Sequence, residues 1–254
     1  MKISIITTTF NSASFIDDCL ASVKKQTFKE IQHIIIDGSS SDETLKILNS
    51  RRDQISDLVS EPDRGIYDAM NKGIKLAKGD IIGILNSDDF YPREDILENV
   101  IREFKRNPFL DACYADLVYV DRKNLSKNIR YWKSSKFIPG SFSKAWCPPH
   151  PTFFVRRSVY ENFGSFDTNY QISADFELMF RFLEINKIVV HYVPEVWVKM
   201  RTGGKSNKSL KNIFFQNQEI IRVFNNYRLK INLINFFFYK VLLRIKQFLI
   251  KPKK

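Results

Sequence analysis

Two adjacent carboxylates, Asp88 and Asp89, are the residues of this chain best placed by type and position to do chemistry. They follow an apolar run, 81–85, that predicts a buried strand, and a short polar step at Asn86 and Ser87. Two like charges this close raise each other's pKa unless a cation neutralises them. Magnesium and manganese bind carboxylate oxygens, so the pair indicates a divalent metal site. A turn or a helix N-cap is the alternative, since Asp is favoured there as well.

Three further predicted strands, at 2–8, 31–37 and 57–60, also end in polar residues. The polar segments that follow them are 8–11, 37–39 and 61–65. In a parallel sheet the carboxyl ends of the strands share one edge, and ligands bind in the crevice beyond it. We therefore expect one site, built from four strand ends and rich in acidic side chains.

Helical patterns alternate with these strands, which predicts an α/β fold with a Rossmann-like, mostly parallel central sheet flanked by helices. The helices of the first half are expected at 15–23, 40–48, 66–77 and 95–104. The second of them has the spacing of a capping box, Ser40 to Glu43. The chain contains neither a G-x-G-x-x-G motif nor a phosphate-binding G-x-x-x-x-G-K-[ST] loop. An acidic crevice without that cradle favours a metal-bound nucleotide diphosphate over a dinucleotide cofactor.

The second half has a different pattern. Strands are expected at 112–121, 127–133, 187–193 and 196–200, and a helix at 173–183. Asp175 lies on that helix beside its apolar face, where partial desolvation would make it more basic. His150 lies among three prolines, and it either reaches the site or holds a rigid loop together. Arg201 opens a flexible basic loop, 201–206. With Arg64, it is a candidate diphosphate contact, since a guanidinium matches phosphate geometry, although both side chains could simply be solvated.

Five segments in this order resemble family-2 glycosyltransferases of the GT-A fold, in particular bacterial enzymes of the colanic-acid or exopolysaccharide type. They are T-T-F-N at 8–11, I-D-G-S-S-S-D-E-T at 36–44, E-P-D-R-G-I-Y-D-A-M-N-K-G at 61–73, L-N-S-D-D at 85–89 and S-A-D-F-E-L-M-F-R at 173–181. The resemblance covers 1–206 and implies a nucleotide-sugar-binding half, 1–106, and an acceptor-binding half, 107–206.

The resemblance also implies roles for single residues. Thr8 and Phe10 fall where the family cradles the base and ribose of the nucleotide, and Asp37 where it contacts the base. Asp88 would face the ribose or the metal, and Asp89 would coordinate Mg²⁺ or Mn²⁺ on the diphosphate. Asp175 would be the general base of an inverting enzyme; on the residues alone, it could also be a solvated helix-face acid.

Three positions depart from the family pattern. They are Gly38, Asn86 and Ala174, each where the family carries an acid. Gly38 removes one possible contact to the nucleotide base, which leaves the choice of nucleotide open, and UDP is the expected one. Asn86 makes one group near the ribose neutral.

The C-terminal segment 207–254 reads as a basic, amphipathic helical tail. From residue 205 onward the chain has 12 Lys and Arg against the single acid Glu219, so this end carries +11 of the net charge of +12. Apolar residues recur at helical spacing between 234 and 249, with basic residues opposite. This pattern is typical of a helix lying in the plane of an anionic membrane. Packing onto the body or onto a partner protein is the alternative, and nucleic acid is not an expected partner.

The whole pattern predicts an inverting, metal-assisted glycosyltransferase. It would transfer a sugar from a nucleotide diphosphate to a lipid-linked or saccharide acceptor in polysaccharide biosynthesis, at the cytoplasmic face of the bacterial inner membrane. Three scattered cysteines, without a C-x-x-C pair or a visible signal peptide, fit a reducing compartment. An inactive nucleotide-sugar binder or scaffold, and a sugar-phosphate nucleotidyltransferase, remain the alternative functions.

Overall fold

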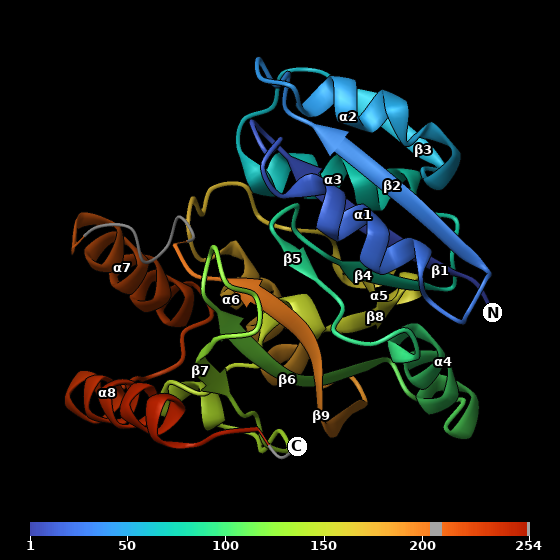
Figure 1. Ribbon diagram of the computed structural model, residues 1–254. Coiled ribbons are helices and arrows are strands. Elements are labelled where there is room, and N and C mark those ends of the chain that lie inside the picture. Colours follow the sequence, from blue (N-terminus) through green and yellow to red (C-terminus); the bar gives the residue numbers. More distant parts are fainter. Residues whose placement is uncertain (204–209, 253–254) are drawn as a thin grey trace.

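A computed structural model describes residues 1–203 and 210–252, which form a mixed α/β fold around one curled sheet of nine strands (Figure 1). Along the sheet the strands are β3 (Asp57–Ser60), β2 (Ile31–Asp37), β1 (Ile3–Thr9), β4 (Ile81–Ile84), β8 (Phe154–Arg156), β6 (Ala112–Val120), β9 (Val190–Arg201) and β5 (Asp89–Phe90). A ninth strand, β7 (Asn128–Trp132), pairs with β6.

The helices lie on both faces of the sheet. In chain order they are α1 (Ile16–Lys24), α2 (Thr44–Ser50), α3 (Ile66–Leu76), α4 (Ile96–Arg106), α5 (Arg157–Phe163), α6 (Ala174–Phe180), α7 (Leu210–Asn226) and α8 (Leu233–Leu249). No helix in the described ranges is both long enough and apolar enough to cross a bilayer.

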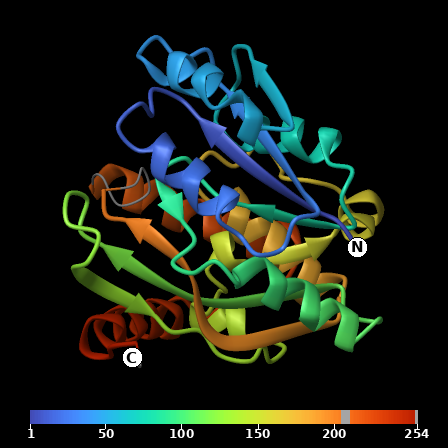
Figure 2. The ribbon, with the colours of Figure 1, turned by 45° about the vertical axis from the view of Figure 1, so that its right-hand side comes forward.

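The first half of the sheet is parallel, as its apolar, β-branched strands predict. Thr9 pairs with Asp37, Asp37 with Ser60, and Ile6 with Ile84, so β1 to β4 end at the same edge. The second half is mixed, because β8 runs antiparallel to both β4 and β6, and β5 runs antiparallel to β9. Figure 2 shows the two halves stacked, with the blue first half above the green and orange strands.

Alternate residues of the strands supply two cores. Ile5 and Ile35 face α1, α2 and α4 on one side of the sheet. Ile6 and Ile34 face α3, α6 and α7 on the other side, together with Phe236 of α8. The tail therefore shares a core with the first strands of the chain, since Val223 and the neighbouring residues of α7 are buried in this second cluster.

Several local predictions were wrong. α2 begins at Thr44 with no side-chain cap, and the Ser40 hydroxyl donates to Asp37 rather than capping a helix. The predicted strands at 187–193 and 196–200 are one strand, β9, whose pairing with β6 shifts register between Tyr192 and Val196. The helix predicted at 173–183 ends at Phe180 and continues as a π-helical turn, Arg181–Ile185.

Candidate active site

Hydrogen bonds between loops hold the carboxyl edge of the sheet together. Asn11, after β1, accepts from the backbone of Ser41, after β2, at 2.9 Å. Ser12 and Ser87 join the loops after β1 and β4 through their hydroxyls, 2.9 Å apart. The convergence of these strand ends, expected from a parallel sheet, is therefore confirmed.

Asp88 and Asp89 differ in accessibility. Asp88 is half-buried, whereas Asp89 is fully buried as the first residue of β5. Burial raises the pKa of Asp89 well above its usual range, and the neighbouring Asp88 charge raises it further. Asn86 donates to one oxygen of Asp89 at 3.4 Å, and the other oxygen has no hydrogen-bond partner among the described residues. A buried carboxylate with an unpaired oxygen is costly without a cation or a proton.

The pair would supply only part of a metal shell. Within residues 1–203 and 210–252, no group of three or more His, Cys, Asp and Glu side chains is placed to hold a metal ion. Magnesium and manganese are often bound by one or two carboxylates together with substrate phosphates and water. The residues present therefore fit a cation that is completed by a bound diphosphate.

Arg201 is the last residue of β9 and is buried, so its placement in a flexible loop was wrong. Lys205 and Ser206 of that predicted loop lie outside the described residues. The Arg201 guanidinium donates to the backbone carbonyl of Asp88 at 2.7 Å and pairs with Asp18 of α1. It thus fixes the loop that carries Asp88.

Asp37 is also fully buried, and both of its oxygens accept hydrogen bonds. Ser40 donates to it through its hydroxyl at 2.5 Å and its backbone N–H at 3.0 Å, and Ser60 donates at 2.7 Å. These bonds hold together the loops that follow β2 and β3. Asp37 has no exposed oxygen left for a nucleotide base in this conformation.

A different acid lies where the family motif has its second carboxylate. A Cβ at Gly38 would lie 2.5 Å from Oδ2 of Asp63 and 3.5 Å from the ring of Phe10. Phe10 is 61% exposed, and Asp63 is half-buried with Oδ1 accepting from the backbone of Gly65 at 2.8 Å. A carboxylate from the loop after β3 therefore lies beside position 38 and beside the exposed ring of Phe10.

Thr8 and Arg64 complete the predicted nucleotide-side residues. Thr8 is buried, and its hydroxyl has no hydrogen-bond partner within the described part of the chain. Arg64 projects into solvent and pairs with Asp68 of α3 at 3.3 Å. Both lie at the carboxyl edge of the sheet, Thr8 near the end of β1 and Arg64 on the loop after β3.

Asp175 lies on the first turn of α6, with its side chain 27% exposed. His150 approaches one carboxylate oxygen with Nδ1 at 3.3 Å, and the Tyr67 hydroxyl approaches the other at 3.2 Å. Burial lowers the pKa of His150, although the Asp175 charge opposes that shift, and burial raises the pKa of Tyr67 well above its usual range. Because Tyr67 lies on the first turn of α3, just after the third strand end, Asp175 faces the same edge of the sheet.

Three residues of this region, Asp63, Tyr67 and Glu219, were not among the predicted site residues. Tyr67 carried a signal, since it lies in the 61–73 block, but helix packing explained it equally well. Asp63 lies in the same block and in the polar segment after the third predicted strand, but no role was predicted for it. Glu219 gave no signal, because its contact with residues 171–173 forms only in the folded chain.

An exposed aromatic ring, an acidic pair and a half-exposed carboxylate at one edge can hold a nucleotide diphosphate and take up a proton. Glycosyl transferase family 2 matches residues 4–164. The chain belongs to this family. Membership confirms that the protein is a glycosyltransferase, and it gives the nucleotidyltransferase alternative no support.

Relatives of this family-2 enzyme include a "PGL/p-HBAD biosynthesis glycosyltransferase" of Mycobacterium tuberculosis, 29% identical over 84% of this chain and 82% of the relative. An uncharacterized glycosyltransferase of Mycoplasma genitalium is 31% identical over 68% of this chain and 63% of the relative.

Solved structures confirm the GT-A fold. S. aureus TarS 1–349 in complex with UDP superposes with a TM-score of 0.65 at 19% identity, and this chain spans 64% of it. Mannosyltransferase PcManGT from Pyrobaculum calidifontis, in complex with GDP-Man and Mn²⁺, has a TM-score of 0.65 at 18% identity, over 95% of this chain and 69% of PcManGT.

Proposed function

We propose that this family-2 enzyme transfers a sugar with inversion, and that Asp175 is the general base. The observation that carries the proposal is the Asp175 carboxylate, half-exposed at the carboxyl edge and held between Tyr67 and His150. The base takes the proton of the acceptor hydroxyl while its oxygen attacks the anomeric carbon from the face opposite the leaving diphosphate. One displacement of this kind inverts the anomeric configuration.

The product's stereochemistry tests this proposal. UDP-glucose, UDP-GlcNAc and GDP-mannose are supplied with MnCl₂ and water as the acceptor, and the fastest donor is followed by NMR before the free sugar mutarotates. We expect the first-formed anomer to be opposite to that of the donor. A first-formed sugar that keeps the donor configuration would contradict inversion.

A divalent cation, Mg²⁺ or Mn²⁺, fits at Asp88 and Asp89 and would neutralise charge on the leaving diphosphate. The unpaired, buried oxygen of Asp89 and the more accessible carboxylate of Asp88 support both as ligands. Asp88 also remains the candidate for the ribose. PcManGT was solved with Mn²⁺ bound, which is consistent with this assignment.

The donor is proposed to be a nucleotide-diphosphate sugar, with UDP as the nucleotide, as in the TarS complexes with UDP and UDP-GlcNAc. Phe10 offers an exposed ring on which a base can stack. Asp63, rather than the fully buried Asp37, offers a carboxylate beside that ring. A carboxylate accepts from the N3–H of uracil, whereas N3 of cytosine is itself an acceptor.

Asp63→Asn is expected to weaken UDP binding by about tenfold or more, because hydrogen bonds to charged groups contribute roughly 1.5–3 kcal/mol. The amide introduced at position 63 can donate to N3 of cytosine, which should strengthen CDP binding. The ratio of UDP affinity to CDP affinity should therefore fall by more than the loss of UDP binding alone. Calorimetry with MnCl₂ measures the dissociation constants of UDP and CDP. The control is Asp53→Asn, on the exposed turn before β3. An unchanged ratio of UDP to CDP affinity would remove Asp63 from base recognition.

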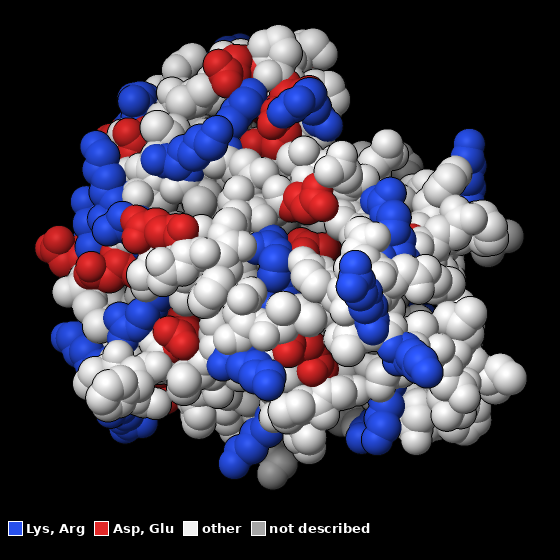
Figure 3. All heavy atoms as spheres, turned by 180° about the vertical axis from the view of Figure 1, so that it is seen from behind, with Lys and Arg blue, Asp and Glu red and all other residues white. Residues whose placement is uncertain are grey.

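The acceptor is proposed to be a lipid-linked or saccharide hydroxyl at the cytoplasmic face of the inner membrane, in polysaccharide biosynthesis. α8 leaves an apolar face uncovered. Its exposed residues are Ile234, Phe237, Phe238, Val241, Leu242, Ile245, Phe248 and Leu249. Lys240 points the other way, bonding to Asn217 of α7, and burial lowers its pKa to about 8. Basic side chains outnumber acidic ones on the side where α7 and α8 lie, the right-hand side of Figure 3.

The double variant Phe238→Ser, Leu242→Ser is expected to lose flotation with vesicles that contain phosphatidylglycerol, because burial of this face in the interface would drive binding. Phe109→Ser removes a more exposed ring from the loop after α4 and should leave flotation unchanged. Equal flotation of all three proteins would mean that α8 is not the membrane contact.

A further inference from the structure

Glu219 is the only acidic residue after position 204, and it forms hydrogen bonds with the loop that precedes the proposed base, Asp175. Glu219 lies on α7, and its carboxylate accepts from three successive backbone N–H groups. The distances are 2.7 Å from Gln171, 3.0 Å from Ile172 and 2.8 Å from Ser173. Bonds of this kind, to an ionised acceptor, are roughly twice as strong as neutral ones.

These three residues lead directly into α6, whose second residue is Asp175. The peptide of Ile172 is held from both sides, since its N–H donates to Glu219 and its carbonyl accepts from the Tyr67 hydroxyl at 2.7 Å. The same Tyr67 hydroxyl lies 3.2 Å from Asp175. The tail, the loop and the proposed base are thus joined by consecutive contacts.

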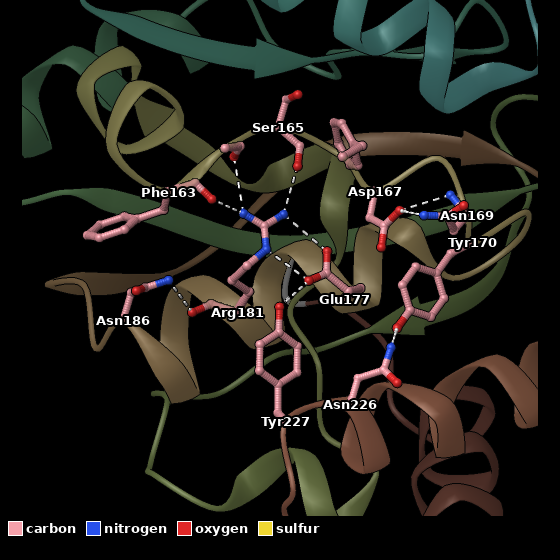
Figure 4. A network of polar contacts seen from close by, with 12 residues as sticks. Phe163, Ser165, Asp167, Asn169, Tyr170, Glu177, Arg181, Asn186, Asn226 and Tyr227 are labelled. Atoms are coloured by element: carbon pink, nitrogen blue, oxygen red, sulfur yellow. Dashed lines mark hydrogen bonds and ion pairs between the residues drawn. The ribbon is translucent and has the colours of Figure 1, made fainter.

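α7 is fixed against α6 along its length. Phe224 packs against Phe180 with ring centroids 5.0 Å apart. Figure 4 shows the polar contacts at the far end of α7, where Tyr227 donates to Glu177 at 2.6 Å and Glu177 pairs with Arg181. Those contacts hold the body of α6, whereas Glu219 holds the segment from which Asp175 projects.

We propose that Glu219 is a positioning residue for Asp175, so that α7 belongs to the catalytic unit rather than to a separable tail. This inference rests on the proposed role of Asp175 as the base. Glu219→Gln keeps the shape of the side chain but turns one acceptor into an NH₂ donor that faces backbone N–H groups. The loop then loses at least one bond and shifts Asp175 relative to the acceptor hydroxyl.

The test uses the full chain, MnCl₂ and the fastest of the three nucleotide sugars, with water as the acceptor. Glu219→Gln is expected to lower kcat by about tenfold to a hundredfold, the cost of a displacement of the order of 1 Å. The donor KM should stay unchanged, because Phe10 and Asp63 lie on other loops. Glu219→Asp keeps the charge and should retain more of kcat than Glu219→Gln.

Hydrogen exchange supplies a second readout, since the amides of Gln171, Ile172 and Ser173 should exchange faster in Glu219→Gln. Glu184→Gln is the matched control. Its carboxylate also accepts from a backbone N–H, that of Gly140 at 2.8 and 2.9 Å, but outside this loop, so kcat should not change.

Faster exchange with an unchanged kcat would overturn the positioning role, and so would a fall in kcat that Glu184→Gln reproduces. If Glu219→Gln does not fold, the same measurements are made on Glu219→Asp. Full kcat in that variant, together with faster exchange of the three amides, would contradict the proposal. Failure of the proposed function is distinguishable, because Asp175→Asn would then retain its turnover.

Discussion

Asp175→Asn is expected to lower kcat by about a thousandfold, within the range that a positioned general base contributes. The amide keeps the size of the side chain and can still contact Tyr67 and His150, but it cannot take up the acceptor proton. Nucleotide binding should be unchanged, because Phe10 and Asp63 lie on the loops after β1 and β3. Release of UDP or GDP measures kcat, and calorimetry with MnCl₂ measures binding.

Asp53→Asn makes the same chemical change at an exposed turn before β3 and should keep full activity. This comparison separates loss of the base from a general effect of losing one charge. Turnover of Asp175→Asn close to that of the unmodified chain would reject Asp175 as the base. Intact nucleotide binding with lost turnover would also contradict the alternative that the protein is an inactive binder or scaffold, because the unmodified form of such a protein has no turnover.

The double variant Asp88→Asn, Asp89→Asn is expected to lower metal-dependent turnover by at least about a hundredfold, since it removes both protein ligands proposed for the cation. The increase in Tm that MnCl₂ with UDP gives the unmodified chain should disappear. Without metal, the single variant Asp89→Asn should unfold at an equal or higher temperature. In the unmodified chain the Asp89 carboxylate is fully buried and one of its oxygens is unpaired. Replacing it with a neutral amide removes the free-energy cost of desolvating that charge.

Asp80→Asn is the control for this experiment, because Asp80 accepts from the backbone of Lys2 at the opposite edge of the sheet. It should keep both turnover and the metal-dependent increase in Tm. A double variant that retains that increase in Tm would show that the cation binds elsewhere or is not required.

The sequence was sufficient for the parallel half of the sheet, and the reason is physical. Strands buried on both faces are continuous apolar runs, and parallel pairing then sends their polar ends to one edge. The acidic pair and the segment of Thr8 and Phe10 could be found in this way, whereas Asp175 was found from the helical pattern at 173–183 and from the family resemblance. The same argument could not place β5, which is only two residues long.

Predictions that depended on local signals were less successful. Two strands were predicted on either side of Pro194, but β9 runs through this residue and its pairing with β6 shifts register there. The capping-box spacing from Ser40 was also misleading, because the Ser40 hydroxyl donates to Asp37 instead of capping the helix. The first case was decided by pairing with a distant strand, and the second by a hydrogen bond between residues only three positions apart.

The space beside Gly38 has a consequence for any side chain introduced at position 38. Its Cβ would lie 2.5 Å from Oδ2 of Asp63, so the Asp63 carboxylate would have to turn away from its present place. An acid at position 38 would therefore add its own charge and also displace the one that Asp63 brings from the loop after β3. The two positions are coupled in this way, and the effect of substituting both should differ from the sum of the two single effects.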